Sequence, residues 1–327
     1  MVRTAGKPVE PAPAHIVGPV PALARVGAVT AILASVLLVI ARFLPYADVG
    51  GIRISPPHAP LDIVAALLWA GVIAAAGCYV VLGRLPRLWL AVLAVSGALA
   101  IGLGIGELYQ LQGAGAHRGV EVFFGRRAVT SSIDALAGVW VHLSAYLLLV
   151  GTLVLTLLAW PRTTMDDNGD FDGRRPLVMG LAALAGLAGV LAVSARPQDT
   201  PDQVLQDISG FRVSVEIAGE VSLLDRLGLD LLSGLLIAFA VFAVALLAAT
   251  LRPRLATVGA LIGLAAYFLS SALLLLLESG RYADLVIAPG GVLYLLSGLA
   301  FAALAAYCVR ADGRDQDART QLPTGRG

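Results

Sequence analysis

Four carboxylates are the residues whose type and position most clearly allow chemistry in this apolar sequence. Asp62, Glu107, Asp230 and Glu278 each lie at one end of a long apolar segment. Acids so close to hydrocarbon usually face a bundle interior, a cavity or a basic partner, because an unpaired charge in lipid is costly. One interpretation is a binding site in an outward-facing vestibule ringed by these acids. The alternative is that the aspartates favour the positive N-terminal end of a helix and the glutamates mark where helices leave the membrane.

Two arginines lie in similar short stretches, Arg53 in "GIRIS" and Arg212 in "GFRVS". Each stretch follows the first apolar segment of its half of the chain. Alternation of apolar and polar residues is typical of a strand, so we expect Ile52 and Ile54 to face the helix ends while Arg53 points elsewhere. The arginines have three open roles: neutralising the nearby acids, meeting lipid headgroups or contacting a partner.

The apolar segments that must position these residues set the fold class. The chain has 327 residues, of which 58% are hydrophobic and 14% charged, with a mean hydropathy of +0.85, which is too apolar for an ordinary soluble domain. A bilayer core of about 30 Å takes about 20 residues of helix, and eight segments meet this length. They predict an all-α polytopic membrane protein. The eight predicted spans are Ala24–Leu44, Leu61–Leu82, Leu88–Leu108, Leu136–Trp160, Leu177–Ala195, Leu227–Thr250, Leu255–Leu277 and Val286–Val309.

The predicted organisation is two four-helix membrane units joined by a cytoplasmic linker. The first span follows a Pro-rich stretch and has no small-residue cleavage site behind a short apolar core, so we expect a retained helix and not a removed signal peptide. The predicted parts are a disordered N-terminus (1–21), a first unit (22–160), the linker (161–176), a second unit (177–309) and a disordered tail (310–327).

Arginine and lysine residues predict the orientation, because short cytoplasmic loops retain positive residues. With the N-terminus inside, 14 of them lie on the inner side and 9 on the outer side. The tight turns "GRLPRLW" and "TLRPRLA" each hold two of the inner arginines. Both termini are therefore expected to be cytoplasmic, in the plasma membrane. Cys78 and Cys308 then lie near inner helix ends in a reducing compartment, where a structural disulfide is not expected.

The two halves share landmarks in the same order, which predicts an internal duplication. An even number of helices per unit gives both units one orientation, so the repeat is expected to be parallel. The paired landmarks are "GIRIS" with "GFRVS", Leu61–Asp62 with Leu229–Asp230, Pro86–Leu88 with Pro253–Leu255, Glu107 with Glu278, and Gly138–Ser144 with Gly291–Ser297.

The outer loops carry patterns of local structure. "GFRVSVEI" alternates as a half-buried strand, and Ala218–Gly219 offers a turn after it. "RGVEVFFGRRAV" alternates as well and turns at Gly125. "TPDQ", Thr200–Gln203, combines a capping residue, a proline and a capping-box glutamine, which predicts a short helix. We expect a small extracytoplasmic cap of hairpins and short helix on the bundle.

Several kinds of chemistry are excluded or disfavoured. A formal net charge of +1 excludes a large basic surface for nucleic acid. "DDNGDFDG" imitates a calcium loop, but the twelfth position counted from Asn168 is Met179 and not a glutamate, so a flexible acidic linker is expected. No phosphate-binding glycine loop, zinc-spaced set or nucleophile elbow is present. We therefore expect no metal and no catalytic residue.

His142 is the one histidine inside a predicted helix. The eight-helix, four-plus-four arrangement resembles that of haem A synthases, a resemblance that implies histidine pairs as haem ligands in both halves. His15, His58 and His117 lie outside the predicted helices and the second half has none, so we expect no haem and no other cofactor. For His142 we expect a hydrogen-bonded interfacial residue, with proton handling as the alternative.

The sequence favours a non-enzymatic scaffold. Its structured outer loops would bind a partner in cell-envelope assembly, and its other partners would be the lipid bilayer or a lipid. The alternative is a transporter or lipid-handling protein with a site at the interface between the units, where the boundary acids converge. A third possibility is a membrane enzyme that acts on a lipid-linked substrate. Acids at helix ends, with proline nearly absent from helix centres, favour the scaffold over a carrier.

Overall fold

The computed structural model describes residues 16–112, 120–123, 126–129, 133–166, 171–200, 203–206, 212–215, 221–282 and 285–310. Within these ranges eight helices are long and apolar enough to cross a membrane. This confirms the eight predicted spans and indicates a multi-pass membrane protein. The helices are α1 (Ala22–Ala41), α2 (Pro60–Val81), α3 (Pro86–Gln110), α4 (Ala137–Ala159), α5 (Arg175–Ser194), α6 (Gly228–Ala248), α7 (Arg254–Arg281) and α8 (Pro289–Arg310).

Apolar residues on all sides make these segments membrane helices. A helix satisfies its backbone hydrogen bonds internally, so it needs no polar face in lipid. Large apolar side chains accordingly remain exposed on the outside of the bundle, among them Val29, Leu184 and Phe239. Pro60 begins α2 and Pro289 begins α8, positions where the N–H that proline lacks has no helical partner.

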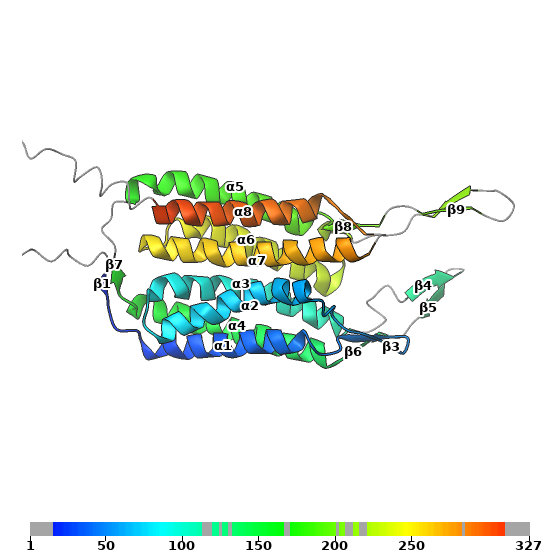
Figure 1. The fold of residues 1–327 in the computed structure, drawn as a ribbon, viewed down its shortest axis with the longest axis horizontal. Helices are drawn as coiled ribbons and strands as arrows, with labels where there is room; N and C mark the ends of the chain where they lie inside the picture. The colour runs from blue at the N-terminus through cyan, green and yellow to red at the C-terminus, as the bar shows by residue number, and fades with distance from the viewer. Residues whose placement is uncertain are drawn as a thin grey trace, which may run out of the picture.

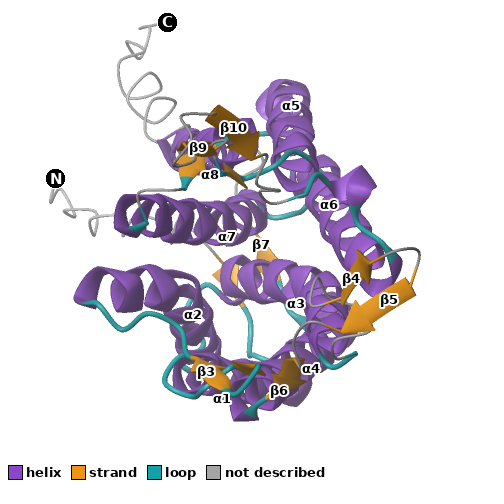
Figure 2. Cartoon of the chain, turned by 90° about the vertical axis from the view of Figure 1, so that its right-hand side faces the viewer, coloured by secondary structure: helices purple, strands orange, loops and turns teal. Residues whose placement is uncertain are grey.

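The helices form two groups with matching contacts. In the first group α1 packs against α2 and α4, and α3 packs against α2 and α4. In the second group α5 packs against α6 and α8, and α7 packs against α6 and α8. Figure 1 shows α1 to α4 in the lower half of the bundle and α5 to α8 in the upper half, and Figure 2 shows the same bundle end-on.

The two groups meet closely along a seam where α3 packs against α6 and α7, and α2 against α7. A Cβ on Gly259 of α7 would lie 2.0 Å from the Leu88 carbonyl oxygen, and one on Gly102 of α3 would lie 2.9 Å from the Ser233 carbonyl oxygen. Ser233 Oγ donates a hydrogen bond to the Gly102 carbonyl at 2.9 Å. Small residues allow such close backbone contact between helices in lipid.

A three-stranded antiparallel sheet lies at one end of the first group, in the order β3 (Ile52–Ile54), β2 (Ala47–Val49), β6 (Ile133–Ala135). Gly50 and Gly51, with φ of 59° and 88°, form the two-residue turn between β2 and β3, a conformation that favours glycine. We call this end of the bundle the loop end. The opposite end, where α1 begins and α8 ends, is the linker end (Figure 1).

The other described strands form two-stranded pairs. In the second group, the β8–β11 pair corresponds in position to the β2–β6 pair of the first group. Each pair joins the strand that follows the first helix of its group (α1 or α5) to the strand that precedes the fourth helix (α4 or α8). The pairs are β1 (Ile16–Val17) with β7 (Met165–Asp166), β8 (Gln198–Asp199) with β11 (Val286–Ile287), β4 (Val120–Phe123) with β5 (Arg126–Val129), and β9 (Gln203–Gln206) with β10 (Arg212–Val215).

Two expectations about the loops are wrong. Ile52 and Ile54 do not face the helix ends but are 72% and 50% exposed, because β3 is an edge strand of its sheet. The helix predicted at Thr200–Gln203 is not formed, since Gln203 begins β9, which pairs with β10. A non-local strand partner outweighs the local capping signal here. The turns predicted at Gly125 and Ala218–Gly219 lie outside the described residues.

At the linker end, arginines bind backbone carbonyls. Arg87 Nε donates to the Thr163 carbonyl at 2.7 Å and its Nη1 to the Arg252 carbonyl at 2.8 Å. Arg175 Nη1 donates to the Ala249 carbonyl just after α6 at 2.9 Å. Ala249 is the C-cap residue of α6, whose last carbonyls lack intrahelical donors. Thr163 and Arg252 lie in the segments that connect helices, where their carbonyls also need donors. The arginines that predict orientation therefore also hold the turns together.

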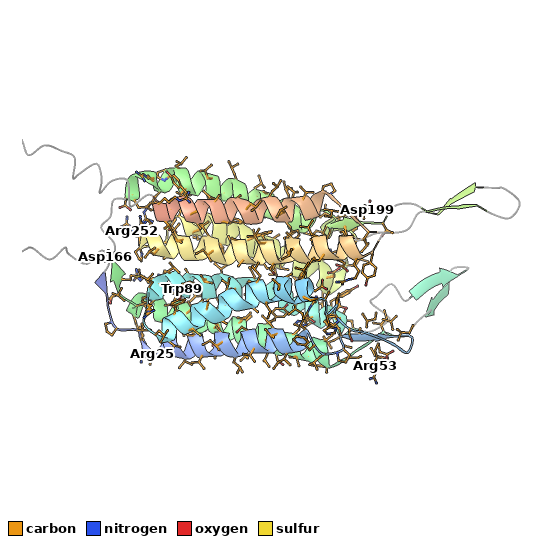
Figure 3. All side chains as sticks on the ribbon, in the orientation of Figure 1. Arg25, Arg53, Trp89, Asp166, Asp199 and Arg252 are labelled. Atoms are coloured by element: carbon orange, nitrogen blue, oxygen red, sulfur yellow. The ribbon has the colours of Figure 1, made fainter. Side chains whose placement is uncertain are left out.

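The acidic stretch of the linker contributes two ion pairs to the same end, both made by Asp172. Asp172 Oδ1 accepts from Arg175 Nε at 2.6 Å, and its Oδ2 lies 3.3 Å from Arg252 Nη2. Figure 3 shows Asp166 and Arg252 at this end of the bundle. The calcium-like motif also covers 167–170, which lie outside the described residues.

Gly259→Ala tests the seam. The new Cβ would meet the Leu88 carbonyl, so we expect a loss of stability of about 1–3 kcal/mol from overpacking, measured by reversible unfolding in mixed detergent micelles. Gly180→Ala on α5 is the matched control, because nothing lies within 4 Å of a Cβ at Gly180. Equal stability of the two variants would contradict the close seam.

Candidate functional site

An ion pair across the seam joins the two helix groups at the loop end. Asp62 lies in the first turn of α2 and is 3% exposed. Its Oδ2 accepts a hydrogen bond from Arg281 Nη2, at the end of α7. A buried carboxylate that loses its partner is strongly destabilising. Asp62 is therefore held by a residue of the other helix group, for which no sequence pattern gives a signal.

Arg42 extends this pair into a cluster. It follows α1 directly as the C-cap residue, and its Nε is buried without a hydrogen-bond partner among the described residues. Burial lowers the pKa of Arg42. The carboxylates of Asp62 and Glu278 act in the opposite direction, whereas the positive charge of Arg281 lowers the pKa further. Two arginines and two acids thus share the ends of α1, α2 and α7. We call Arg42, Asp62, Glu278 and Arg281 the loop-end ionic cluster.

A second cluster surrounds Glu107 near the end of α3. Tyr46 Oη donates to Glu107 Oε2 at 2.9 Å, and His142 Nδ1 lies 3.8 Å from Glu107 Oε1. The His142 ring stacks on Tyr146 with centroids 6.1 Å apart, and Tyr46 meets it edge-on at 5.9 Å. We call these four residues the Glu107 cluster. Arg42 also interacts electrostatically with His142, so the two clusters adjoin.

Tyr46 connects this cluster to the sheet. Burial and then the charge of Glu107 raise the pKa of the Tyr46 phenol well above its usual value, so the hydroxyl stays protonated and donates. Its backbone N–H donates to the Ile54 carbonyl and its carbonyl accepts from the Leu136 N–H, both at 2.9 Å. One residue therefore ties the sheet to a buried acid on α3.

The remaining predicted residues lie elsewhere. Asp230 Oδ1 lies 3.4 Å from Arg226 Nη1, a partner four residues away at the start of α6. Arg53 is exposed on β3, lies opposite Asp48 of β2 and forms no ion pair with any residue in the described ranges; Figure 3 shows it beyond the helix ends. Arg212 lies in β10, and its side chain is outside the described part of the chain.

The structure thus brings four of the seven predicted residues together: Asp62 and Glu278 in the loop-end ionic cluster, and Glu107 and His142 in the Glu107 cluster. Tyr46, Tyr146 and Arg281 are partners that were not predicted. Tyr146 has a recognisable signal, since it follows His142 by one helical turn. Arg281 has none, because its partner lies 219 residues away.

The arrangement is suited to holding structure and exchanging hydrogen bonds. No three His, Cys, Asp or Glu residues of the described ranges are grouped so that they could hold a metal ion. Comparison of the chain with protein-family models, with curated proteins and with solved structures finds no match.

A double-mutant cycle with Asp62→Asn and Arg281→Gln measures the cross-unit pair. We expect a coupling energy of about 1–3 kcal/mol in unfolding free energy, since the carboxylate is buried while the arginine is partly exposed. The matched cycle uses Asp230→Asn with Arg226→Gln, a partly exposed pair four residues apart, and should give at most about 1 kcal/mol. Equal coupling energies in the two cycles would show that the Asp62–Arg281 pair stabilises the fold no more than a local pair does.

Proposed function

We propose that the protein is a non-enzymatic membrane scaffold. Two four-helix units, related by a parallel internal duplication, present the loop end on the extracytoplasmic side of the plasma membrane, with both termini in the cytoplasm. The loop end binds an extended segment of a cell-envelope partner beside strand β3. The single observation that carries this proposal is the exposed edge strand Ile52–Arg53–Ile54, held on the helix ends by β2 and Tyr46.

Backbone hydrogen bonds support the duplication. Gly138 N–H donates to the Pro45 carbonyl at 3.0 Å in the first unit, and Gly290 N–H donates to the Arg196 carbonyl at 2.9 Å in the second. The bond from Leu136 to Tyr46 likewise has a counterpart from Ala288 to Pro197 at 3.1 Å. Exchanging the units also converts the α3–α6 contact into the α7–α2 contact. These bonds favour pairing Gly138 with Gly290, one residue from the pairing that the sequence comparison gives.

The orientation is supported by the fixed arginines of the linker end. Arg87 and Arg175 bind backbone carbonyls there, so their guanidinium groups are held at the linker end. Positive residues held at one membrane surface favour the cytoplasmic side for it. The loop end then faces outward.

The two faces of the sheet differ, which suggests the chemistry of the partner. Strand register puts Ile52 and Ile54 on one face and Arg53 on the other, in a row with Asp48 of β2 and Asp134 of β6. A strand that pairs with β3 would set its own residue opposite Arg53. An acid at that position would pair with Arg53 on one face of the sheet. The β-branched apolar residues on either side of it would pack beside Ile52 and Ile54 on the other face. The partner segment is therefore apolar, acidic, apolar, added to the edge of the sheet.

The transporter alternative has less support. Its site would be a vestibule lined by boundary acids, but Asp62 is held by Arg281 and Asp230 by Arg226. A carrier would have to break these pairs to bind a ligand. Glu107 is likewise held by Tyr46, which anchors the sheet.

A photo-reactive residue at Ile52 tests the proposal in intact cells. We expect a crosslink to one envelope protein, mapped by mass spectrometry to a segment with an acid between apolar residues. Arg53→Glu should weaken binding of a peptide of that segment about tenfold, because an attractive cross-strand pair becomes repulsive. Replacing the peptide's acid by lysine should restore binding to the variant.

Leu224 provides the matched control. It is also exposed at the loop end, but it lies in a short 3-10 helix and not in a sheet. The same crosslinker there should not capture the partner. Equal capture at both sites, or a crosslink from Ile52 to residues 120–129 of the chain itself, would overturn the proposal.

A further inference from the structure

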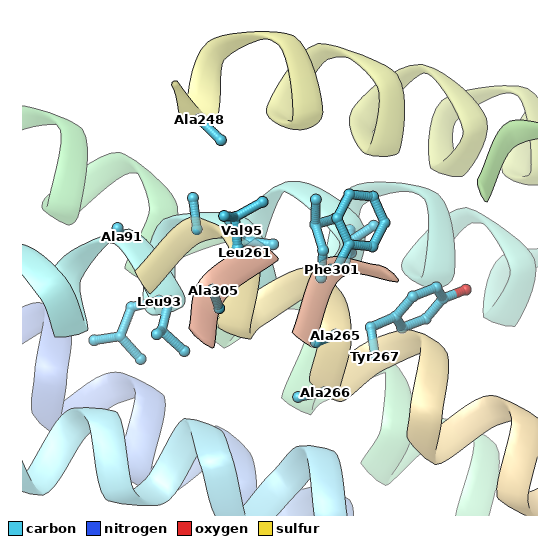
Figure 4. Close-up of a cluster of buried hydrophobic side chains, with 14 of the residues drawn as sticks. Ala91, Leu93, Val95, Ala248, Leu261, Ala265, Ala266, Tyr267, Phe301 and Ala305 are labelled. Carbon is cyan, nitrogen blue, oxygen red and sulfur yellow. The ribbon is translucent and has the colours of Figure 1, made fainter. Parts of the chain in front are cut away.

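An apolar groove of about 400 Å³ runs along the seam between α2, α7 and α8. Its walls include Leu68 of α2, Val258 and Leu269 of α7, and Ala306 and Val309 of α8. Ala306 and Val309 are exposed, so the groove opens on the outer surface of the bundle. Figure 4 shows the small side chains of Ala265 and Ala266 on α7 and Ala305 on α8, which also line it.

Three alanines of α8 line the groove at positions where the aligned residues of α4 are larger. The hydrogen bonds that pair Gly138 with Gly290 align Ala302, Ala305 and Ala306 of α8 with Val150, Leu153 and Val154 of α4. This alignment rests on the proposed duplication, whereas the groove itself does not. The aligned face of α4 therefore carries more apolar side-chain volume than this face of α8.

The dimensions fit one acyl chain of one leaflet. At about 1.5 Å per residue, the lining from Val258 to Leu269 covers roughly 16 Å of α7. This is about half of a bilayer core of about 30 Å. Val258 lies about one turn from the start of α7, so the groove extends from the linker end to about the middle of the bundle.

The surroundings of the groove favour a lipid tail over an empty space. An unfilled groove forfeits the dispersion contacts of its lining, and hydrocarbon chains are the solvent around these helices. Arg310 directly follows Val309 at the mouth and is exposed. A guanidinium at the membrane surface attracts anionic headgroups.

We propose that this groove binds the acyl chain of one phospholipid from the linker-end leaflet, with the headgroup phosphate at Arg310. The site is independent of the loop-end partner. It makes a lipid a specific third element of the seam, packed between a helix of the first unit and two helices of the second.

Photo-crosslinking in liposomes tests the site. The probe is phosphatidylglycerol with a diazirine on one acyl chain, and its adducts are mapped by mass spectrometry. We expect adducts concentrated on residues 258–269 and 302–309. The triple substitution Ala302→Val, Ala305→Leu, Ala306→Val copies the α4 side chains into the groove and should lower this labelling at least fivefold. The single Ala306→Leu, at an exposed position, should lower it at least twofold and guards against a folding defect.

Two controls separate a specific site from general lipid contact. Gly71→Leu adds apolar volume on α2 where nothing lies within 4 Å, and should leave the labelling unchanged. Arg310→Ala should weaken retention of phosphatidylglycerol about fivefold, near 1 kcal/mol, with a smaller effect on phosphatidylcholine. Even labelling of all helices, or labelling that does not change when the groove alanines are replaced by larger residues, would overturn the proposal. Loss of partner binding in the Arg53 variant would leave the lipid site intact.

Discussion

The constraint on which this structure depends is that a polar group at the membrane boundary must find its partner within the protein. Lipid offers no hydrogen bonds, and the boundary is too dry to stabilise an isolated charge cheaply. Asp62 is satisfied by Arg281 across the seam, and Glu107 by the phenol of Tyr46. Each buried acid therefore fixes two elements that are distant in sequence. Asp62 and Glu107 therefore stabilise contacts between elements of the bundle.

The two ends of the bundle meet this constraint in different ways. At the linker end, Arg87 and Arg175 bind backbone carbonyls of the segments that connect the helices. At the loop end, arginine and tyrosine bind carboxylates, and Tyr46 also connects to the sheet because its backbone is hydrogen-bonded to Ile54 and Leu136. The exposed strand β3 is thus supported by a buried contact on α3. This support reaches β3 through β2 and Tyr46, without a large domain beyond the helix ends.

In the proposed duplication, the two four-helix units share a backbone arrangement but have different side chains, and the candidate sites lie where the side chains differ. Asp62 and Asp230 begin corresponding helices, yet one binds across the seam and the other binds Arg226 beside it. The groove lies where α8 has alanines in place of the larger residues of α4. Duplication of a four-helix unit would supply two equivalent faces, and divergence would then give one face a ligand and the other a packed surface.

The sequence by itself determined the membrane class and the eight helices, because apolar length is a local property that needs no partner. The predicted first span, Ala24–Leu44, and α1 at Ala22–Ala41 differ by a few residues at each end. It also drew attention to Asp62, Glu107 and His142. Only the tertiary structure decided which partner each acid has, since Arg281 and Asp62 are brought together by packing of α7 on α2. The same reason explains the errors at Ile52, Ile54 and "TPDQ": whether a strand face is buried, and whether a capping signal prevails, depends on non-local pairing that local sequence does not encode.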